Sequence, residues 1–159
     1  MTEKLAFHIR HIEARDRDQW EELFLAYGVF YETAFTQDIV DGVWTWLMDQ
    51  AHSVSGFVAE SESDSDSEGT VVGFAHLRQQ ADTFRAGPSW FLDDLFTTPS
   101  ARGQGVGRAL IDALKAHGAS HGGGDLRWIT AADNRSAQHL YDTLASRTSW
   151  VMYEVDTES

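Results

Sequence analysis

The spacing of apolar residues along the chain switches between the two-residue period of a strand and the three- to four-residue period of a helix. Leu5, Phe7 and Ile9 alternate with polar residues, which predicts a first strand with one buried face. Two helical patterns follow, the first starting after Asp16 or Asp18 and the second spanning about residues 38–50. Their apolar positions are Trp20, Leu23, Phe24 and Tyr27 in the first and Ile39, Val43, Trp44 and Leu47 in the second.

Two further apolar stretches, 54–59 and 71–77, predict the strands of an antiparallel hairpin. The segment between them, 60–69, is acidic, of low complexity and without an apolar residue, so it is expected to be a mobile loop. Its acidic spacing resembles the opening of a calcium-binding loop. Ala75 stands where the twelfth residue of such a loop would be glutamate, so calcium is not expected.

The second half of the chain alternates strand and helix patterns. Residues 90–97 form an apolar run that ends before Pro99, and a glycine-rich turn then leads into a helix with an apolar stripe at Val106, Leu110, Ile111 and Leu114. A strand over 126–132, a helix beginning after Asn134 and a closing strand over 150–155 follow, and the tail 156–159 is expected to fray. This order predicts an α/β fold with helices over a central sheet.

Length and composition fit one domain spanning residues 1–159, since 42% of residues are hydrophobic and 23% charged. The formal charge of −13 argues against nucleic acid or an anionic membrane as a partner and would attract a cationic substrate. The chain has no cysteine, and hence no thiolate nucleophile. No stretch reaches membrane-spanning length, so a cytoplasmic protein is expected. His117 and His121 have the spacing of metal ligands, but Gly118 lies between them and no metal site is predicted.

The glycine-rich turn predicts an anion-binding site. Gly103, Gly105 and Gly107 lead into a helix N-terminus, where unpaired backbone amides and the helix dipole favour a bound anion, and Arg102 and Arg108 add positive charge. The Walker loop is excluded because no Gly-Lys-Ser or Gly-Lys-Thr is present, and the glycine spacing does not match the dinucleotide fingerprint. A phosphorylated ligand is therefore predicted.

Two motifs resemble those of the GNAT acetyltransferase family: Arg102-x-x-Gly105-x-Gly107, and Asn134-x-x-Ala137-x-x-Leu140-Tyr141. The resemblance implies a central, mixed, mostly antiparallel sheet flanked by helices on both faces, with acetyl-CoA as co-substrate. It also implies a set of cofactor-binding residues: Leu95, Phe96 and Thr97 along the pantetheine arm; Arg102, Gly103, Gln104, Gly105, Val106, Gly107 and Arg108 around the pyrophosphate; and Asn134, which would contact the cofactor or cap its helix. Residues 142–146 lack the Gly-Phe pair that commonly follows the family tyrosine, so that side of the acceptor pocket differs.

The same resemblance assigns catalytic and acceptor residues. Tyr141 corresponds to the tyrosine that faces the CoA sulfur and would act as general acid; the alternative is an inward tyrosine that only packs. The segment with Asp93 and Asp94 is similar to one in spermidine/spermine acetyltransferases, which makes Asp93 the candidate base, directly or through water, and Asp94 the amine-binding group. Adjacent strand residues face opposite ways, so both enter one pocket only if a bulge intervenes. Tyr31 and Glu32 are further acceptor candidates.

The expected function is direct transfer of an acetyl group from acetyl-CoA to a primary amine, and the expected acceptor is a small cationic amine such as a polyamine. A protein or peptide lysine acetyltransferase and a non-catalytic acyl-CoA-binding sensor are the alternatives. An exposed final strand would also permit a homodimer.

Overall fold

The computed structural model describes residues 4–62 and 69–158 of the chain. The chain forms two compact units, residues 1–128 and 129–159. That the whole chain is one domain stays a prediction. Most of the expected loop 60–69 falls on residues 63–68, which lie outside the described residues.

Five strands of the N-terminal unit form one sheet in the order β1-β2-β3-β4-β5. The strands are β1 (Phe7–His11), β2 (Val54–Ser61), β3 (Val71–Asp82), β4 (Gly87–Thr97) and β5 (Leu126–Arg127). The first four pair antiparallel, whereas β5 pairs with β4 in parallel. The structure thus confirms the α/β class, the mixed and mostly antiparallel sheet, and the β2–β3 hairpin.

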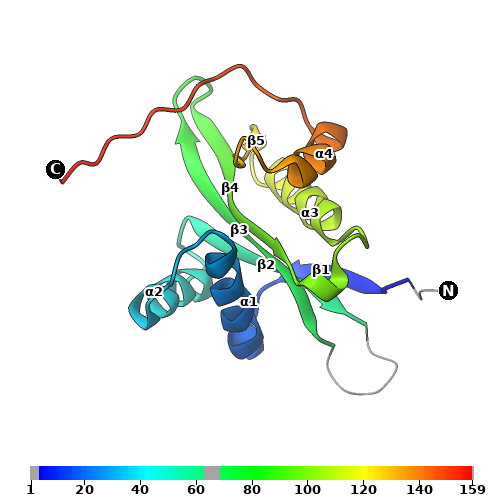
Figure 1. Ribbon diagram of the computed structural model, residues 1–159. Coiled ribbons are helices and arrows are strands. Elements are labelled where there is room, and N and C mark those ends of the chain that lie inside the picture. The colour runs from blue at the N-terminus through cyan, green and yellow to red at the C-terminus, as the bar shows by residue number, and fades with distance from the viewer. Residues whose placement is uncertain (1–3, 63–68, 159) are drawn as a thin grey trace. The chain divides into compact units, whose positions relative to one another are not determined.

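Helices lie on both faces of this sheet (Figure 1). On one face are α1 (Arg17–Phe30) and α2 (Gln37–Met48), and on the other is α3 (Val106–Ser120). Short 3-10 helices precede α1 (η1, Ala14–Asp16) and follow β4 (η2, Pro99–Ala101). Burial of the apolar stripes joins these layers, because each amphipathic helix must cover its apolar side. The cluster under α1 and α2 consists of Trp20, Leu23, Phe24, Val40, Leu47, Val58, Val71, Phe74 and Phe96.

The buried face of α2 differs slightly from the predicted one. Ile39 is exposed, and Val40 lies in the core in its place. Helix α2 begins at Gln37 after Thr36, whose hydroxyl accepts from the Ile39 backbone N–H, and this sets the phase of the helix. From Val40, the spacings of three, four and seven residues reach Val43, Trp44 and Leu47, which all pack against the cluster.

Two predicted strands are shorter or missing. The strand expected over 126–132 contains only Leu126, which pairs with Trp90 of β4, and Arg127, which pairs with Phe91. In the C-terminal unit, α4 (Arg135–Leu144) forms as predicted, but the strand expected over 150–155 does not. A strand needs a partner that accepts and donates backbone hydrogen bonds, and no described strand pairs with these residues. Their large apolar side chains, Trp150, Val151, Met152, Tyr153 and Val155, are exposed.

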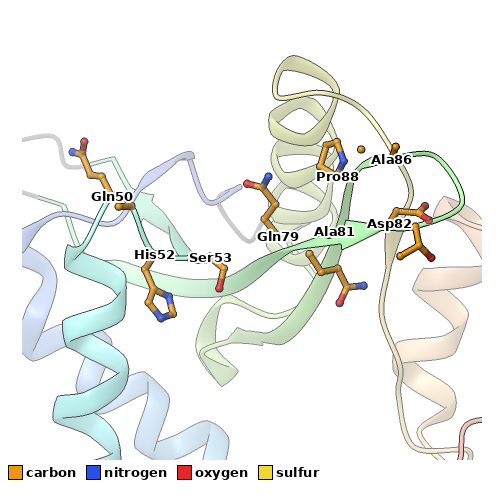
Figure 2. Close-up of a pocket in the computed structure, with 12 residues that line it drawn as sticks. Gln50, His52, Ser53, Gln79, Ala81, Asp82, Ala86 and Pro88 are labelled. Atoms are coloured by element: carbon orange, nitrogen blue, oxygen red, sulfur yellow. The ribbon is translucent and has the colours of Figure 1, made fainter.

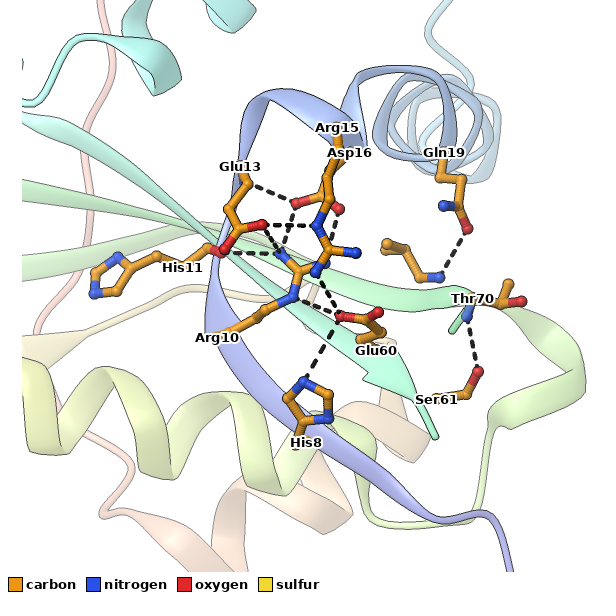
Figure 3. Close-up of polar contacts among 11 residues, drawn as sticks. His8, Arg10, His11, Glu13, Arg15, Asp16, Gln19, Glu60, Ser61 and Thr70 are labelled. Atoms are coloured by element: carbon orange, nitrogen blue, oxygen red, sulfur yellow. Dashed lines mark hydrogen bonds and ion pairs between the residues drawn. The ribbon is translucent and has the colours of Figure 1, made fainter. Parts of the chain in front are cut away.

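A buried ion network ties β1 to η1 and β2 (Figure 3). Arg10 donates from its two terminal nitrogens to Asp16 at 2.7 and 2.8 Å, and from Nε to Glu60 at 2.6 Å. The hydrogen bond to Asp16 leads the causes that raise the pKa of Arg10, and the hydrogen bond from Arg10 lowers the pKa of Glu60. Glu60 was expected in the acidic loop. It belongs to β2 and is buried, because Arg10 neutralises it there.

Candidate active site

A β-bulge in β4 brings two adjacent carboxylates to one face of the sheet. His76 of β3 pairs with Asp94, but the next residue, Leu77, pairs with Leu92, so Asp93 is the extra residue of β4. Asp94 contacts His76 and Asp93 contacts Arg78, and these two β3 residues are two positions apart. Since residues at i and i+2 of a strand share a face, both carboxylates lie toward the same side, the side of α1. The bulge that both acids would need in order to face one pocket is therefore present.

Asp94 is the more enclosed of the two acids. Its Oδ2 accepts from His76 Nδ1 at 2.8 Å, and its side chain is 25% exposed. The side chain of Tyr27, from α1, also influences this carboxylate. Burial acts to raise the pKa of Asp94, but the interactions with His76 and Tyr27 outweigh it and lower the pKa. The same burial, with the Asp94 charge, raises the pKa of Tyr27, which stays protonated. Asp94 is thus a fixed negative charge that solvent can still reach.

Asp93 is held by a different partner. Arg78 donates from Nε to Oδ2 and from Nη2 to Oδ1, both at 3.0 Å, in a bidentate ion pair. The Arg78 guanidinium also lies over the Phe91 ring, at 5.1 Å from its centroid. The side chains of the pair are 40% and 32% exposed. The Arg78 guanidinium therefore places a positive charge beside the two acids.

Tyr31 and Glu32 lie where the chain turns after α1. The Gly28 carbonyl accepts from the backbone N–H of Tyr31 at 3.0 Å and of Thr33 at 2.8 Å, which turns the chain back across the helix end. Glu32 adopts a left-handed φ of 56° in this turn. The Tyr31 ring is 4.9 Å from that of Tyr27, so Tyr31 joins the Asp94 neighbourhood through Tyr27. Both Tyr31 and Glu32 are exposed.

The glycine-rich turn has the features of an anion cradle. Gly103 and Gly105 have left-handed φ values of 76° and 86°, and a Cβ at either would meet nothing within 4 Å. The first backbone hydrogen bond of α3 runs from Ala109 to Gly105. Within the described part of the chain, the amides of residues 103–107 have no acceptor. Unpaired donors at a helix N-terminus, in open space, suit the pyrophosphate of a coenzyme A thioester.

The end of β4 leads directly into this cradle. Beyond Phe91, β4 has a described strand on the β3 side only, so the edge along Leu95, Phe96 and Thr97 is open to an extended ligand. Arg102 folds back on this end, donating from Nε to the Thr97 carbonyl at 3.1 Å and lying 5.5 Å from the Phe96 centroid. The Gln104 side chain accepts from the Leu5 backbone N–H at 3.2 Å, which ties the turn to the N-terminal segment.

Asn134 and Tyr141 lie in the C-terminal unit. Asn134 Oδ1 accepts from the Ala137 backbone N–H at 3.3 Å, so Asn134 caps α4 as expected. Tyr141 lies in α4, one helical turn beyond Ala137, and is half-buried.

A hollow in the described structure lies at the other end of the sheet (Figure 2). It has a volume of about 860 Å³ and is formed by the 50–53 turn and the β3–β4 hairpin, with Gln50, His52 and Ser53 on one side and Ala81, Ala86 and Pro88 on the other. Pro88 is six residues from Asp94, or roughly 20 Å along the strand. The hollow is therefore separate from the cradle and the two acids.

Two sequence expectations concern features outside the site. Among residues 4–62 and 69–158, no group of three or more His, Asp or Glu side chains is arranged to hold a metal ion. His117 and His121 stack on each other with their centroids 4.0 Å apart. No helix in the described part of the chain has the length and apolarity needed to span a membrane.

Comparison with known proteins agrees with this geometry. The chain is similar to an aminoglycoside N-acetyltransferase solved with CoA (TM-score 0.80, 20% identity, 99% of both chains) and to a ribosomal-protein-alanine N-acetyltransferase from Brucella melitensis biovar Abortus 2308 (TM-score 0.76, 19% identity, 95% of this chain and 99% of that one). In sequence it is 27% identical over 146 residues to a D-amino-acid N-acetyltransferase of Saccharomyces cerevisiae, covering 92% of this chain and 88% of the relative. The fold is thus that of N-acetyltransferases of known structure.

The family follows from a match to a family model. The model of the acetyltransferase (GNAT) family matches residues 13–145, so the chain belongs to that family. It is an acetyl-CoA-dependent N-acetyltransferase, and acetyl-CoA is its co-substrate.

Four residues around the acids were not assigned to the site from the sequence. They are Trp20, Tyr27, His76 and Arg78. Trp20 and Tyr27 were assigned to the core, because they lie on the apolar face that a helix packs against a sheet. His76 did carry a signal, since it is a polar residue within the apolar run of β3.

Proposed function

We propose that this enzyme transfers the acetyl group directly from acetyl-CoA to a primary amine, and that the acceptor is a small cationic amine such as a polyamine. The observation that carries the proposal is the pair of carboxylates at the β4 bulge, both facing α1, next to the edge of β4 that leads to the cradle. An ammonium group suits Asp94, because this carboxylate keeps its charge and remains reachable. The excess of acidic residues over the whole chain favours the approach of a cation.

The two acids have separate roles in this proposal. Asp94 binds the ammonium form of the acceptor, and Asp93 takes its proton, through a water molecule because Arg78 occupies both carboxylate oxygens. The neutral amine then attacks the thioester carbonyl, forming the C–N bond as the C–S bond breaks, and the nitrogen loses its second proton, which balances the one given to the departing thiolate. Asp94→Asn should raise the KM for amine, while Asp93→Asn should lower kcat. Two variants with wild-type values for both constants would remove the acids from the site.

Tyr141 is proposed as the general acid that protonates the departing thiolate. Its phenol holds its proton at neutral pH and matches a thiolate in basicity. Tyr141→Phe should keep the affinity for acetyl-CoA and lower kcat roughly 10²-fold, as the loss of general acid catalysis does. Tyr153→Phe is the matched control, because Tyr153 is an exposed tyrosine of the same unit. Unchanged turnover in Tyr141→Phe would leave this tyrosine a packing role.

An amino acid is a second candidate acceptor, favoured by Arg78. A zwitterion could place its ammonium at Asp94 and its carboxylate at the half-exposed guanidinium of Arg78. The similarity to a D-amino-acid N-acetyltransferase supports the same candidate.

The deciding experiment measures CoA thiol release from acetyl-CoA against spermidine, spermine, an aminoglycoside, D-amino acids and a lysine-rich peptide. Turnover restricted to small polycations supports the proposal, and turnover of D-amino acids supports the second candidate. A preference for the peptide would favour the protein acetyltransferase. Binding of acetyl-CoA without any thiol release would favour the acyl-CoA sensor.

We also propose that the enzyme is a homodimer in which a second copy covers residues 150–155. The sequence predicts a strand here, yet in the described structure the segment pairs with no strand and exposes five large apolar side chains. Pairing with a strand edge of another copy would satisfy its backbone and bury those side chains. Analytical ultracentrifugation should give a dimer, and Trp150→Asp with Met152→Asp should give a monomer. A monomeric wild type would contradict the proposal.

A further inference from the structure

A line of three polar side chains crosses the core from α1 to the candidate acceptor site. Trp20 Nε1 donates to His76 Nε2 at 3.0 Å, and His76 Nδ1 lies 2.8 Å from Asp94 Oδ2. Trp20 and His76 are buried, at 0% and 2% exposure. The rings of Phe24 and Phe74 pack against the imidazole, at 5.2 and 4.8 Å between centroids, and keep its surroundings apolar.

This line fixes the tautomer of His76. An indole nitrogen is a donor only, so Nε2 of His76 must present its lone pair to Trp20. The imidazole proton therefore sits on Nδ1, which donates to Asp94. A second proton on Nε2 would set two N–H groups against each other inside an apolar core, where an unpaired donor is costly. His76 is thus neutral, and Asp94 keeps its full negative charge.

The same geometry excludes a catalytic dyad. In a His–Asp dyad that works as a base, the carboxylate orients one ring nitrogen and the other takes a proton from the substrate. Here the other nitrogen, Nε2, is covered by Trp20 and buried. His76 therefore cannot receive the proton of the acceptor amine, and its influence must pass through Asp94.

We propose that His76 is a positioning residue that fixes the Asp94 carboxylate for the acceptor ammonium, and that Trp20 holds His76 in the required tautomer. This inference rests on the proposed function of Asp94. A carboxylate has about four lone-pair positions. His76 occupies one of them, and others stay open on the reachable part of the side chain. The acceptor then meets a carboxylate that cannot rotate away, which lowers the entropic cost of binding it.

Two substitutions at one position separate positioning from packing. His76→Phe fills the space but removes the donor to Asp94, whereas His76→Asn keeps an amide N–H close to the place of Nδ1. We expect His76→Phe to raise the KM for the amine about tenfold or more, the usual effect of losing a hydrogen bond to a charged group. The kcat and the Kd for acetyl-CoA should change little. His76→Asn should recover most of the amine KM, although it leaves the larger cavity. A wild-type amine KM in His76→Phe, or equal defects in both variants, would overturn the proposal.

The tautomer is tested without any turnover. Ring ¹⁵N chemical shifts of the wild-type enzyme, with the His76 signals assigned by their absence from His76→Asn, should show a protonated Nδ1 and an unprotonated Nε2. Trp20→Phe should move this signature toward a mixture of tautomers. A protonated Nε2 in the wild type would overturn the inference. If no amine were acetylated by the wild type, the proposed function would fail, while these shifts would still decide whether the line of hydrogen bonds exists.

Discussion

Arg78 and Asp93 face each other across the β3–β4 pair, and the guanidinium donates to both carboxylate oxygens at 3.0 Å. Asp93 is also the extra residue of the bulge, so the ion pair and the bulge occur at the same point of the sheet. One residue further along β4, Asp94 faces His76. Two adjacent acids thus carry different net charges: Asp93 is neutralised, and Asp94 is not. The candidate acceptor site therefore combines the unpaired charge of Asp94 with the ion pair of Asp93 and Arg78.

Arg78→Gln should separate cationic acceptors from zwitterionic ones. Removing this positive charge should lower the KM for spermidine, roughly threefold if the ammonium binds about 6 Å away, since a repulsion over that distance costs about 0.7 kcal/mol in water. The KM for a D-amino acid should rise instead, because its carboxylate loses its partner. Steady-state kinetics with both acceptors give the answer.

Arg17→Gln is the matched control for that variant. Arg17 also pairs with two carboxylates, the half-buried Glu21 and the exposed Asp41, but it lies ten residues before Tyr27 on α1, or about 15 Å along the helix. It should leave both KM values unchanged. Equal KM values for spermidine in wild type and Arg78→Gln would place the ammonium elsewhere.

The sequence predicted features that depend on local spacing. The apolar stripe of α3, the glycine turn at its N-terminus and the Asn134 cap each need only a few neighbouring residues, and each is present. The bulge at Asp93 could not be predicted from the sequence, because it depends on the register between two strands. The burial of Glu60 was missed for a similar reason: its partner, Arg10, lies 50 residues away in the chain. The prediction of a strand at 150–155 was wrong, because a strand pattern in the sequence does not show whether another strand is available to pair with it.

Gly118 and Gly42 should respond to alanine in opposite ways. Gly42 in α2 has nothing within 4 Å of its Cβ position, so Gly42→Ala should stabilise the protein by up to about 1 kcal/mol through helix propensity. At Gly118 in α3 a Cβ would lie 3.1 Å from the Trp90 ring. That ring is buried and donates from Nε1 to the Gly123 carbonyl at 2.8 Å, so it cannot move aside. Gly118→Ala should cost about 1–3 kcal/mol in urea unfolding. A stabilised Gly118→Ala would show that the ring adjusts.

Gly105→Ala tests the cradle. Gly105 has a left-handed φ of 86°, and a residue with a Cβ in this conformation should destabilise the folded state by about 1–2 kcal/mol. The new Cβ would also enter the open space beside the unpaired amides, so the Kd for acetyl-CoA, measured by calorimetry, should rise at least tenfold. Gly123→Ala carries a similar strain, with φ of 73°, outside the cradle. It should lose similar stability and keep the acetyl-CoA Kd. Equal affinities in the two variants would remove Gly105 from the site.

Arg10→Met should be among the most destabilising single changes in the N-terminal unit. It leaves Asp16 and Glu60 buried, with side-chain exposures of 2% and 7%, and without their main cation. Breaking a buried ion pair from one side costs about 3–5 kcal/mol. Arg17→Gln, which breaks pairs with the more exposed Glu21 and Asp41, should cost less, about 1 kcal/mol. Urea unfolding at pH 7 compares the two, and similar losses would mean that solvent reaches the network.

The free energy of unfolding should fall with acid, and the same network should set the slope. The pKa values of Asp16, Glu60 and Asp94 are lowered in the folded protein from ordinary values of 3.8 for aspartate and 4.5 for glutamate. Between the folded and unfolded pKa values the unfolded chain binds more protons, so stability rises with pH there. The contribution is complete above about pH 5 and is lost as the pH falls below the unfolded values.

His117 should also lower the free energy of unfolding as the pH falls, but at a higher pH than the carboxylates. Burial and the nearby His121 and His11 lower its pKa from 6.5, so below that pH the unfolded chain again binds more protons. Urea unfolding from pH 7 to pH 3 should therefore give a shallow loss near pH 6 and a steeper loss below pH 4.5. Arg10→Met should flatten the steeper part, because Asp16 and Glu60 then regain higher pKa values in the folded state. A variant whose stability falls in parallel with the wild type at every pH would show that other carboxylates carry the acid sensitivity.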